Sequence, residues 1–275
     1  DFKNIFNDEK ELLNNNFYKY FQKNYKSWIN NPKKGPVLSS GVFKNTLYPI
    51  IKSDKKLIFI IIDCFRLDQW KQVSKLFRNN YEINEQSHFS IIPTATPFAR
   101  NAIFSGLMPL DLKNNYPDEW SEMFKEHKLN SYEDYFFRKL LDKNNFSDKK
   151  IHYEKISNYE EGSKFYNRLS DFKDVDILSI VVNFVDILGH SRSESSVLKE
   201  LIPNESAYRN AVYNWFNNSW LKDCLNKFSE WDAEIVITSD HGNIMVSKPT
   251  KVKADNTASQ GVRYKYGRNL NIDDK

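Results

Sequence analysis

Carboxylate and imidazole side chains stand at three places in this sequence where they could bind a metal ion together. Asp63, Asp186 with His190, and Asp240 with His241 each stand at or just after the end of an apolar run. These oxygen and nitrogen donors suit zinc, and sometimes manganese or magnesium. One such Asp could equally be a turn residue or a helix N-cap. Three such places, two of them with a histidine, predict a metal site.

A fourth segment, Pro93-Thr94-Ala95-Thr96-Pro97, could supply a nucleophile. Thr96 is expected at the start of a helix, and its hydroxyl would become nucleophilic if a divalent metal helped to remove its proton. The alternative is that Thr96 only caps the helix. Arg100, four residues later, would lie on the same helix face and could clamp phosphate oxygens, or it could form an ordinary surface salt bridge.

Three apolar runs are predicted to be the strands that position these residues, namely Leu57–Ile62, Asp176–Val185 and Glu234–Thr238. The first is rich in β-branched residues and lacks polar alternation, which is typical of a strand covered on both faces. Helical patterns separate the runs, so we expect an α/β fold with a mostly parallel sheet flanked by helices. Such sheets gather the carboxyl ends of their strands at one edge, where ligands bind.

The remaining elements are predicted from periodicity and from turn residues. Helices are expected over 68–78, 98–104, 118–126, 132–141 and 205–228, and a further strand over 82–92. Residues 114–159 are polar and aromatic, so we interpret them as an insertion or cap outside the sheet. Residues 1–30 have the pattern of an amphipathic helix with a break near 14–16. The prolines at 32 and 36 place a boundary there, which gives a helical connector over 1–35 and a main domain over 36–275.

Composition limits the classes of protein to consider. The 275 residues carry a net charge of +4, which does not demand a nucleic-acid groove. Two cysteines cannot build a disulfide framework, so we expect a reducing compartment. No apolar run approaches the roughly 18 residues that span a bilayer, and we expect a cytoplasmic location. Because the chain begins with Asp1, we expect a fragment or a processed product.

The order of these motifs resembles that of the alkaline phosphatase superfamily. Three stretches resemble its PglZ-type branch: Asp-Cys-Phe-Arg-Leu-Asp-Gln-Trp from residue 63, Ala-Arg-Asn-Ala-Ile-Phe-Ser-Gly-Leu-Met-Pro from 99, and Arg-Tyr-Lys-Tyr-Gly-Arg-Asn-Leu from 263. Within that branch, the chain is similar to the output domains of response regulators that control type IX secretion. The resemblance runs from about residue 38 to the end, and residues 1–30 resemble the helix that follows the receiver domain in such regulators.

The resemblance implies two metal ions, usually zinc. Asp63, Thr96, Asp240 and His241 would hold one ion, with Thr96 as the nucleophile that forms a phosphothreonine. The other ion would be held by Asp186 and His190, together with a third ligand from a histidine near the C-terminus. This sequence has no histidine after His241, so we expect that ligand beyond Lys275. If the chain naturally ended at Lys275, the catalytic interpretation would weaken considerably.

We therefore expect a metal-dependent phosphohydrolase. A phosphodiester substrate, such as a nucleotide or oligonucleotide, is favoured because basic and aromatic residues cluster after Gly242, although such a cluster can also be a solvated face. The basic members are Lys248, Lys251, Lys253, Arg263, Lys265 and Arg268. The alternatives are a phosphomonoesterase and a catalytically inactive signalling or binding domain. An upstream receiver domain, secretion-system or transcription partners and a homodimer follow from the resemblance alone.

Overall fold

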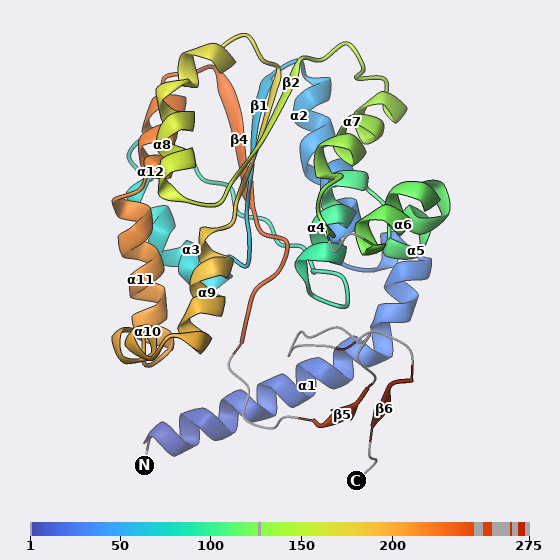
Figure 1. The fold of residues 1–275 in the computed structure, drawn as a ribbon, viewed down its shortest axis with the longest axis vertical. Coiled ribbons are helices and arrows are strands. Elements are labelled where there is room, and N and C mark those ends of the chain that lie inside the picture. Colours follow the sequence, from blue (N-terminus) through green and yellow to red (C-terminus); the bar gives the residue numbers. More distant parts are fainter. Residues whose placement is uncertain (1, 126–127, 245–249, 255–264, 266–268, 273–275) are drawn as a thin grey trace.

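The core of the molecule is a four-stranded parallel sheet with the strand order β2-β3-β1-β4. The computed structural model describes residues 2–125, 128–244, 250–254, 265 and 269–272. The four strands are β1 (Lys56–Ile62), β2 (Ile151–Ile156), β3 (Ile177–Val182) and β4 (Ala233–Thr238). This sheet, with helices on both of its faces, confirms the predicted α/β fold (Figure 1).

Strand β1 lies at the centre of the sheet because both of its faces are apolar. Its side chains from Leu57 to Ile62 are completely buried. Ile58 and Ile60 belong to one hydrophobic core, whereas Leu57 and Phe59 belong to the other. This alternation is what a strand between two helical layers requires, since successive side chains point to opposite faces.

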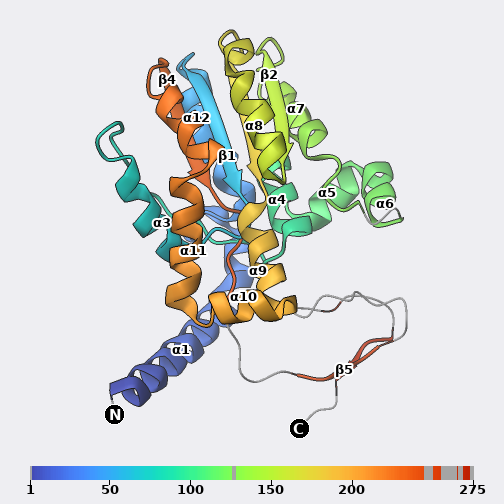
Figure 2. The same cartoon turned by 60° about the vertical axis from the view of Figure 1, so that its left-hand side comes forward.

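The helices form two layers, one on each face of the sheet (Figures 1 and 2). One layer contains α3 (Leu67–Val73), α8 (Tyr159–Asn167), α9 (Phe184–Glu194), α10 (Ser196–Leu201), α11 (Glu205–Asn217) and α12 (Trp220–Phe228). The other contains α2 (Tyr48–Lys52), α4 (Thr96–Ser105) and α7 (Glu133–Lys143), with α5 (Pro109–Asn115) and α6 (Pro117–Lys125) beside them. Among the described residues, none of the helices has both the length and the apolar composition needed to cross a membrane.

Helix α1 (Phe2–Asn30) is continuous, so the predicted break near residues 14–16 is wrong. Those three residues are asparagines, which lower helix propensity only modestly, and the helix contains neither glycine nor proline. The C-terminal part of α1 contacts the main body, where Trp28 packs with Phe89 and Ile91. Its N-terminal part projects away from the body in Figure 1.

Two of the predicted strand assignments are wrong. Residues 82–88 form no strand, and Phe89 makes only an isolated bridge to Leu38. The polar run from Asn84 to Ser87 gives this segment little apolar surface to bury in the sheet. Conversely, the region 114–159 contains β2, which forms an edge of the sheet. β2 is only partly buried, and its sequence, Ile-His-Tyr-Glu-Lys-Ile, mixes polar and apolar residues, so it lacks the continuous apolar pattern of a central strand.

The predicted long helix over 205–228 is two helices. Helix α11 ends at Asn217, and α12 begins at Trp220, with the hydroxyl of Ser219 accepting a hydrogen bond from the backbone N–H of Lys222. This capping interaction favours a new helix start at Ser219 over continuation of α11.

Near the C-terminus, β5 (Val252–Lys253) pairs in an antiparallel manner with β6 (Asn271–Ile272). Of the predicted basic cluster, Lys251, Lys253 and Lys265 are described. Lys248, Arg263 and Arg268 lie outside the described residues.

Candidate metal centre

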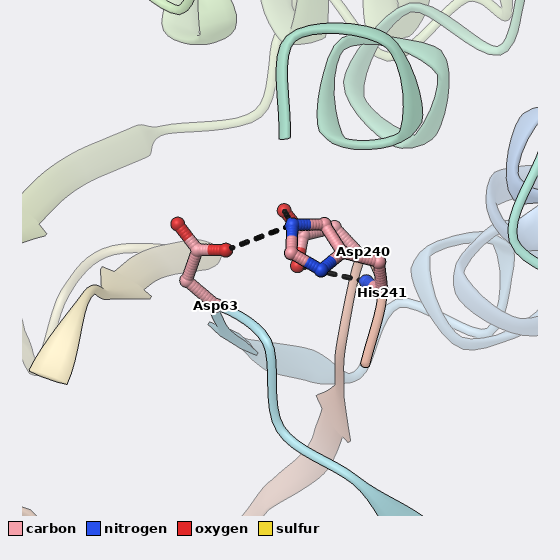
Figure 3. Close-up of side chains that lie close together, drawn as sticks. All are labelled: Asp63, Asp240 and His241. Carbon is pink, nitrogen blue, oxygen red and sulfur yellow. Dashed lines mark hydrogen bonds and ion pairs between the residues drawn. The ribbon is translucent and has the colours of Figure 1, made fainter. Parts of the chain in front are cut away.

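Asp63, Asp240 and His241 meet at the carboxyl edge of the sheet (Figure 3). Asp63 directly follows β1, and Asp240 follows the neighbouring strand β4 by two residues. All three side chains are buried, and each has a potential ligand atom within 4.8 Å of the others. The backbone N–H of Asp63 donates to the carbonyl of Val182 at the end of β3, which fixes the position of this turn.

The ring of His241 is oriented toward the two carboxylates. Its Nδ1 lies 3.1 Å from the carbonyl oxygen of Gly242. Because a carbonyl only accepts hydrogen bonds, Nδ1 carries the hydrogen, and a neutral ring then has its lone pair on Nε2. Nε2 lies 3.5 Å from Oδ1 of Asp63 and 3.9 Å from Oδ2 of Asp240. A backbone carbonyl that fixes the ring in this way is typical of metal-binding histidines.

Asp240 offers one oxygen that is ready for a cation. Its Oδ1 accepts hydrogen bonds from the backbone N–H groups of Cys64, at 3.2 Å, and His241, at 2.9 Å. Its Oδ2 is buried and makes no hydrogen bond within the part of the chain that the structure describes. A buried carboxylate oxygen without a donor is costly unless a cation neutralises it. The three side chains therefore fit a divalent metal ion.

The protonation of these carboxyl groups supports the same conclusion. Burial, followed by the charge of the neighbouring Asp240, raises the pKa of Asp63 to about 7, although Arg100 and His241 oppose the shift. Burial also raises the pKa of Asp240. The protein without metal thus disfavours two adjacent negative charges here, and a divalent cation would remove that penalty.

The hydroxyl group of Thr96 lies next to Asp63 and His241. Thr96 is the first residue of α4, where Pro97 follows in a position that suits a helix start. Its Oγ1 lies 3.2 Å from Oδ1 of Asp63 and 2.9 Å from Nε2 of His241. The N-cap position belongs to Ala95, so the alternative that Thr96 serves only as an N-cap is not what the structure shows.

Arg100 is buried next to the same site, so the alternative of a surface salt bridge is wrong. Its Nη1 donates to Oδ2 of Asp63 at 2.7 Å and to Oδ1 of Asn183 at 3.2 Å. Its Nε donates to Oε1 of Glu133 at 2.5 Å. The predicted contact of Arg100 with a substrate phosphate stays a prediction. Glu133 was not singled out from the sequence, because a lone carboxylate in an amphipathic helix carries no motif.

Asp186 and His190 lie apart from this group as a separate pair. Asp186 belongs to the first turn of α9 instead of the end of a strand, because β3 ends at Val182 and the helix begins two residues later. Oδ2 of Asp186 lies 3.5 Å from Nε2 of His190, whose side chain is 73% exposed. Burial and the charge of Asp63 raise the pKa of Asp186, so the two sites interact electrostatically. A second metal ion held by this pair stays a prediction.

A parallel sheet between two helical layers, with a buried Asp, Asp and His group at its carboxyl edge, is consistent with an alkaline phosphatase-like domain. A family model described as the BREX system PglZ alkaline phosphatase-like domain matches residues 42–275. The chain therefore belongs to the PglZ family, and so to a superfamily of metal-dependent phosphohydrolase type. No curated protein matches the chain.

Proposed function

We propose that this PglZ domain is a zinc-dependent phosphodiesterase in which Thr96 is the nucleophile. The observation that carries this proposal is the position of the Thr96 hydroxyl at the N-terminus of α4, within 3.2 Å of both Asp63 and His241. The N-terminus of a helix favours anions, so a substrate phosphate would be attracted to this point.

Asp63, Thr96, Asp240 and His241 would hold one zinc ion, and Asp186 with His190 would contribute to a second. A bound zinc ion would stabilise the deprotonated hydroxyl and withdraw electron density from the phosphoryl group. Oδ1 of Asp63, at 3.2 Å, is positioned to accept the hydroxyl hydrogen of Thr96. Oγ1 then bonds to phosphorus while the bond to the leaving alcohol breaks, and the alcohol takes up the proton that Asp63 accepted. Water subsequently cleaves the phosphothreonine and returns a proton to Oγ1.

The preference for diesters rests on the lysines that follow β4. These lysines, of which the structure describes Lys251, Lys253 and Lys265, would attract the phosphate groups of the substrate. The aromatic residues between the basic positions would suit stacked bases. A phosphomonoesterase remains the second catalytic proposal. A signalling domain with little or no hydrolysis is favoured by one observation: the exposed His190 has only Asp186 as its partner for a metal site among the described residues.

The cellular role that we propose follows from the sequence resemblance to PorX, a response regulator of type IX secretion. Residues 1–35 would then connect an upstream receiver domain to the PglZ domain over 36–275. Secretion-system or transcription partners, a homodimer and a cytoplasmic location belong to the same proposal.

Substitution of Thr96 tests the proposed chemistry. Thr96→Ala should abolish turnover of bis-nitrophenyl phosphate while zinc binding largely remains. Thr94→Ala is the matched control in the same turn, and it should retain turnover. Wild-type activity in Thr96→Ala would overturn the role of Thr96. The enzymatic proposal fails if wild type extended past Lys275 and supplied with zinc shows no turnover.

A further inference from the structure

Glu133 is a buried carboxylate that contacts Arg100, which in turn contacts Asp63 of the metal centre. It is the first residue of α7, only 1% of it is exposed, and its surroundings supply three donors. Nε of Arg100 and the hydroxyl of Tyr153 each donate at 2.5 Å, and Nζ of Lys155 lies at 2.9 Å. A carboxylate with this many charge-assisted and neutral hydrogen bonds is held in one position.

Arg100 connects Glu133 to the site. The guanidinium lies between two carboxylates, with Nε on Glu133 and Nη1 on Oδ2 of Asp63. Helices α4 and α7 pack against each other, so the fold brings Arg100 and Glu133 together from distant parts of the sequence. A change at Glu133 therefore reaches Asp63 through one planar, rigid guanidinium group.

Glu133 carries its negative charge because two cations lie beside it. Burial alone would raise the pKa of Glu133, but Arg100 and Lys155 more than offset it, so its pKa lies below the ordinary value and the group is ionised. The ionised Glu133 thus offsets the positive charges of Arg100 and Lys155 beside the metal centre. Removal of the charge on Glu133 would leave an excess positive charge beside the metal centre and free Arg100 to move. The excess positive charge disfavours a divalent cation, and a displaced Arg100 would no longer hold the Asp63 carboxylate in place for one.

We propose that Glu133 is a positioning residue that raises the metal affinity of the Asp63, Asp240 and His241 group by holding Arg100 against Asp63. This inference rests on the metal binding in the proposed function, but not on the role of Thr96 or on the substrate. Tyr153 and Lys155 of β2 help to hold the Glu133 carboxylate in this position.

The test is zinc affinity of the metal-free chain, measured by competition with a chromophoric chelator in the absence of substrate. Glu133→Gln keeps the shape and removes the charge, and we expect zinc binding to weaken about 10- to 100-fold, the range for residues that support metal ligands. The matched control is Glu154→Gln. Glu154 is on β2 between Tyr153 and Lys155 but binds Arg168 and His152, so zinc affinity should not change.

A double-mutant cycle separates positioning from a general loss of stability. In an Arg100→Gln background, adding Glu133→Gln should change zinc affinity less than about twofold, because Glu133 acts through Arg100. A lower melting temperature of Glu133→Gln with unchanged zinc affinity would overturn the proposal. If wild type binds zinc and Glu133→Gln binds it equally well, only the role of Glu133 fails. If wild type itself binds no zinc, the proposed function fails as well.

Should Glu133→Gln fail to fold, Tyr153→Phe provides the second test. It removes one donor to Glu133 and preserves the charge and the ring packing against Phe104. We expect zinc affinity to fall severalfold with little loss of structure by circular dichroism. Zinc affinity equal to that of wild type would then count against the proposal.

Discussion

Replacement of Arg100 by methionine removes the cation that lies between Asp63 and Glu133. The side chains of all three residues are at most 5% exposed, so water cannot replace the lost hydrogen bonds. Removing one partner of a buried ion pair costs about 3–5 kcal/mol, because the remaining charge stays buried without compensation. For a chain of this size, 1 kcal/mol corresponds to about 2–4 °C, so the melting temperature should fall by about 6–20 °C.

The loss of stability in Arg100→Met should depend on pH, and the pKa of Asp63 determines whether the loss is larger at high or at low pH. The pKa of Asp63 in the folded protein, about 7, lies above its ordinary value of 3.8, so its protonated form is favoured by folding. That contribution is complete below about pH 4 and is lost as the pH rises through 7. Because Arg100 lowers the pKa of Asp63, the variant should raise it further. Arg100→Met should therefore be more destabilising at pH 8 than at pH 5.

Thermal unfolding followed by circular dichroism, with a chelator present, measures this difference. The matched control is Arg138→Met, since Arg138 pairs with Asp134 on the surface, where the two side chains are 45% and 39% exposed. Such a pair contributes about 0.2–1 kcal/mol. If Arg100→Met and Arg138→Met lost the same stability at pH 8, the buried network would not have the energetic role assigned to it.

Three further predictions concern the metal, the nucleophile and the packing of the fold. Zinc should raise the melting temperature, and the increase should grow from pH 5 to pH 8 because protons compete for Asp63; a pH-independent increase in scanning calorimetry would count against binding there. Thr96→Ser should retain turnover of bis-nitrophenyl phosphate within about tenfold, because it keeps the hydroxyl, and a complete loss would contradict the nucleophile assignment. In Gly162→Ala, the new Cβ would lie 2.0 Å from Nε1 of Trp220, so urea unfolding should show a loss of about 1–3 kcal/mol, and an unchanged midpoint would refute this packing argument.

The central strands and the grouping of Asp63, Asp240 and His241 could be predicted from the sequence because each has a local signal. β1 is a continuous apolar run after Lys56, and β3 is interrupted only by Ser179; this pattern requires cover on both faces. Asp63 stands directly beyond an apolar strand, and the Asp240-His241 pair begins two residues beyond another; parallel strands bring such residues to one edge. The proximity of Thr96 to both of them agrees with its predicted place at the helix start.

The parts that could not be predicted depend on contacts between distant residues. β2 is an edge strand whose polar residues Tyr153 and Lys155 point to a buried carboxylate, so its sequence does not resemble that of a core strand. Glu133 is recognisable only once α4 and α7 are packed together. Conversely, residues 82–92 include strand-forming residues, but within the described part of the chain they pair only through the isolated bridge between Phe89 and Leu38, so local propensity alone misled the prediction.

Identification of the residue that carries the reaction intermediate is the most direct test of the central claim. Wild type with zinc, mixed with bis-nitrophenyl phosphate and quenched in acid, should carry a nitrophenylphosphoryl group on Thr96 when the peptides are mapped by mass spectrometry. Thr96→Ala, and wild type with a chelator, should carry none. A label on another residue, or wild-type turnover by Thr96→Ala, would contradict the assignment of Thr96 as the nucleophile of a metal-dependent phosphohydrolase.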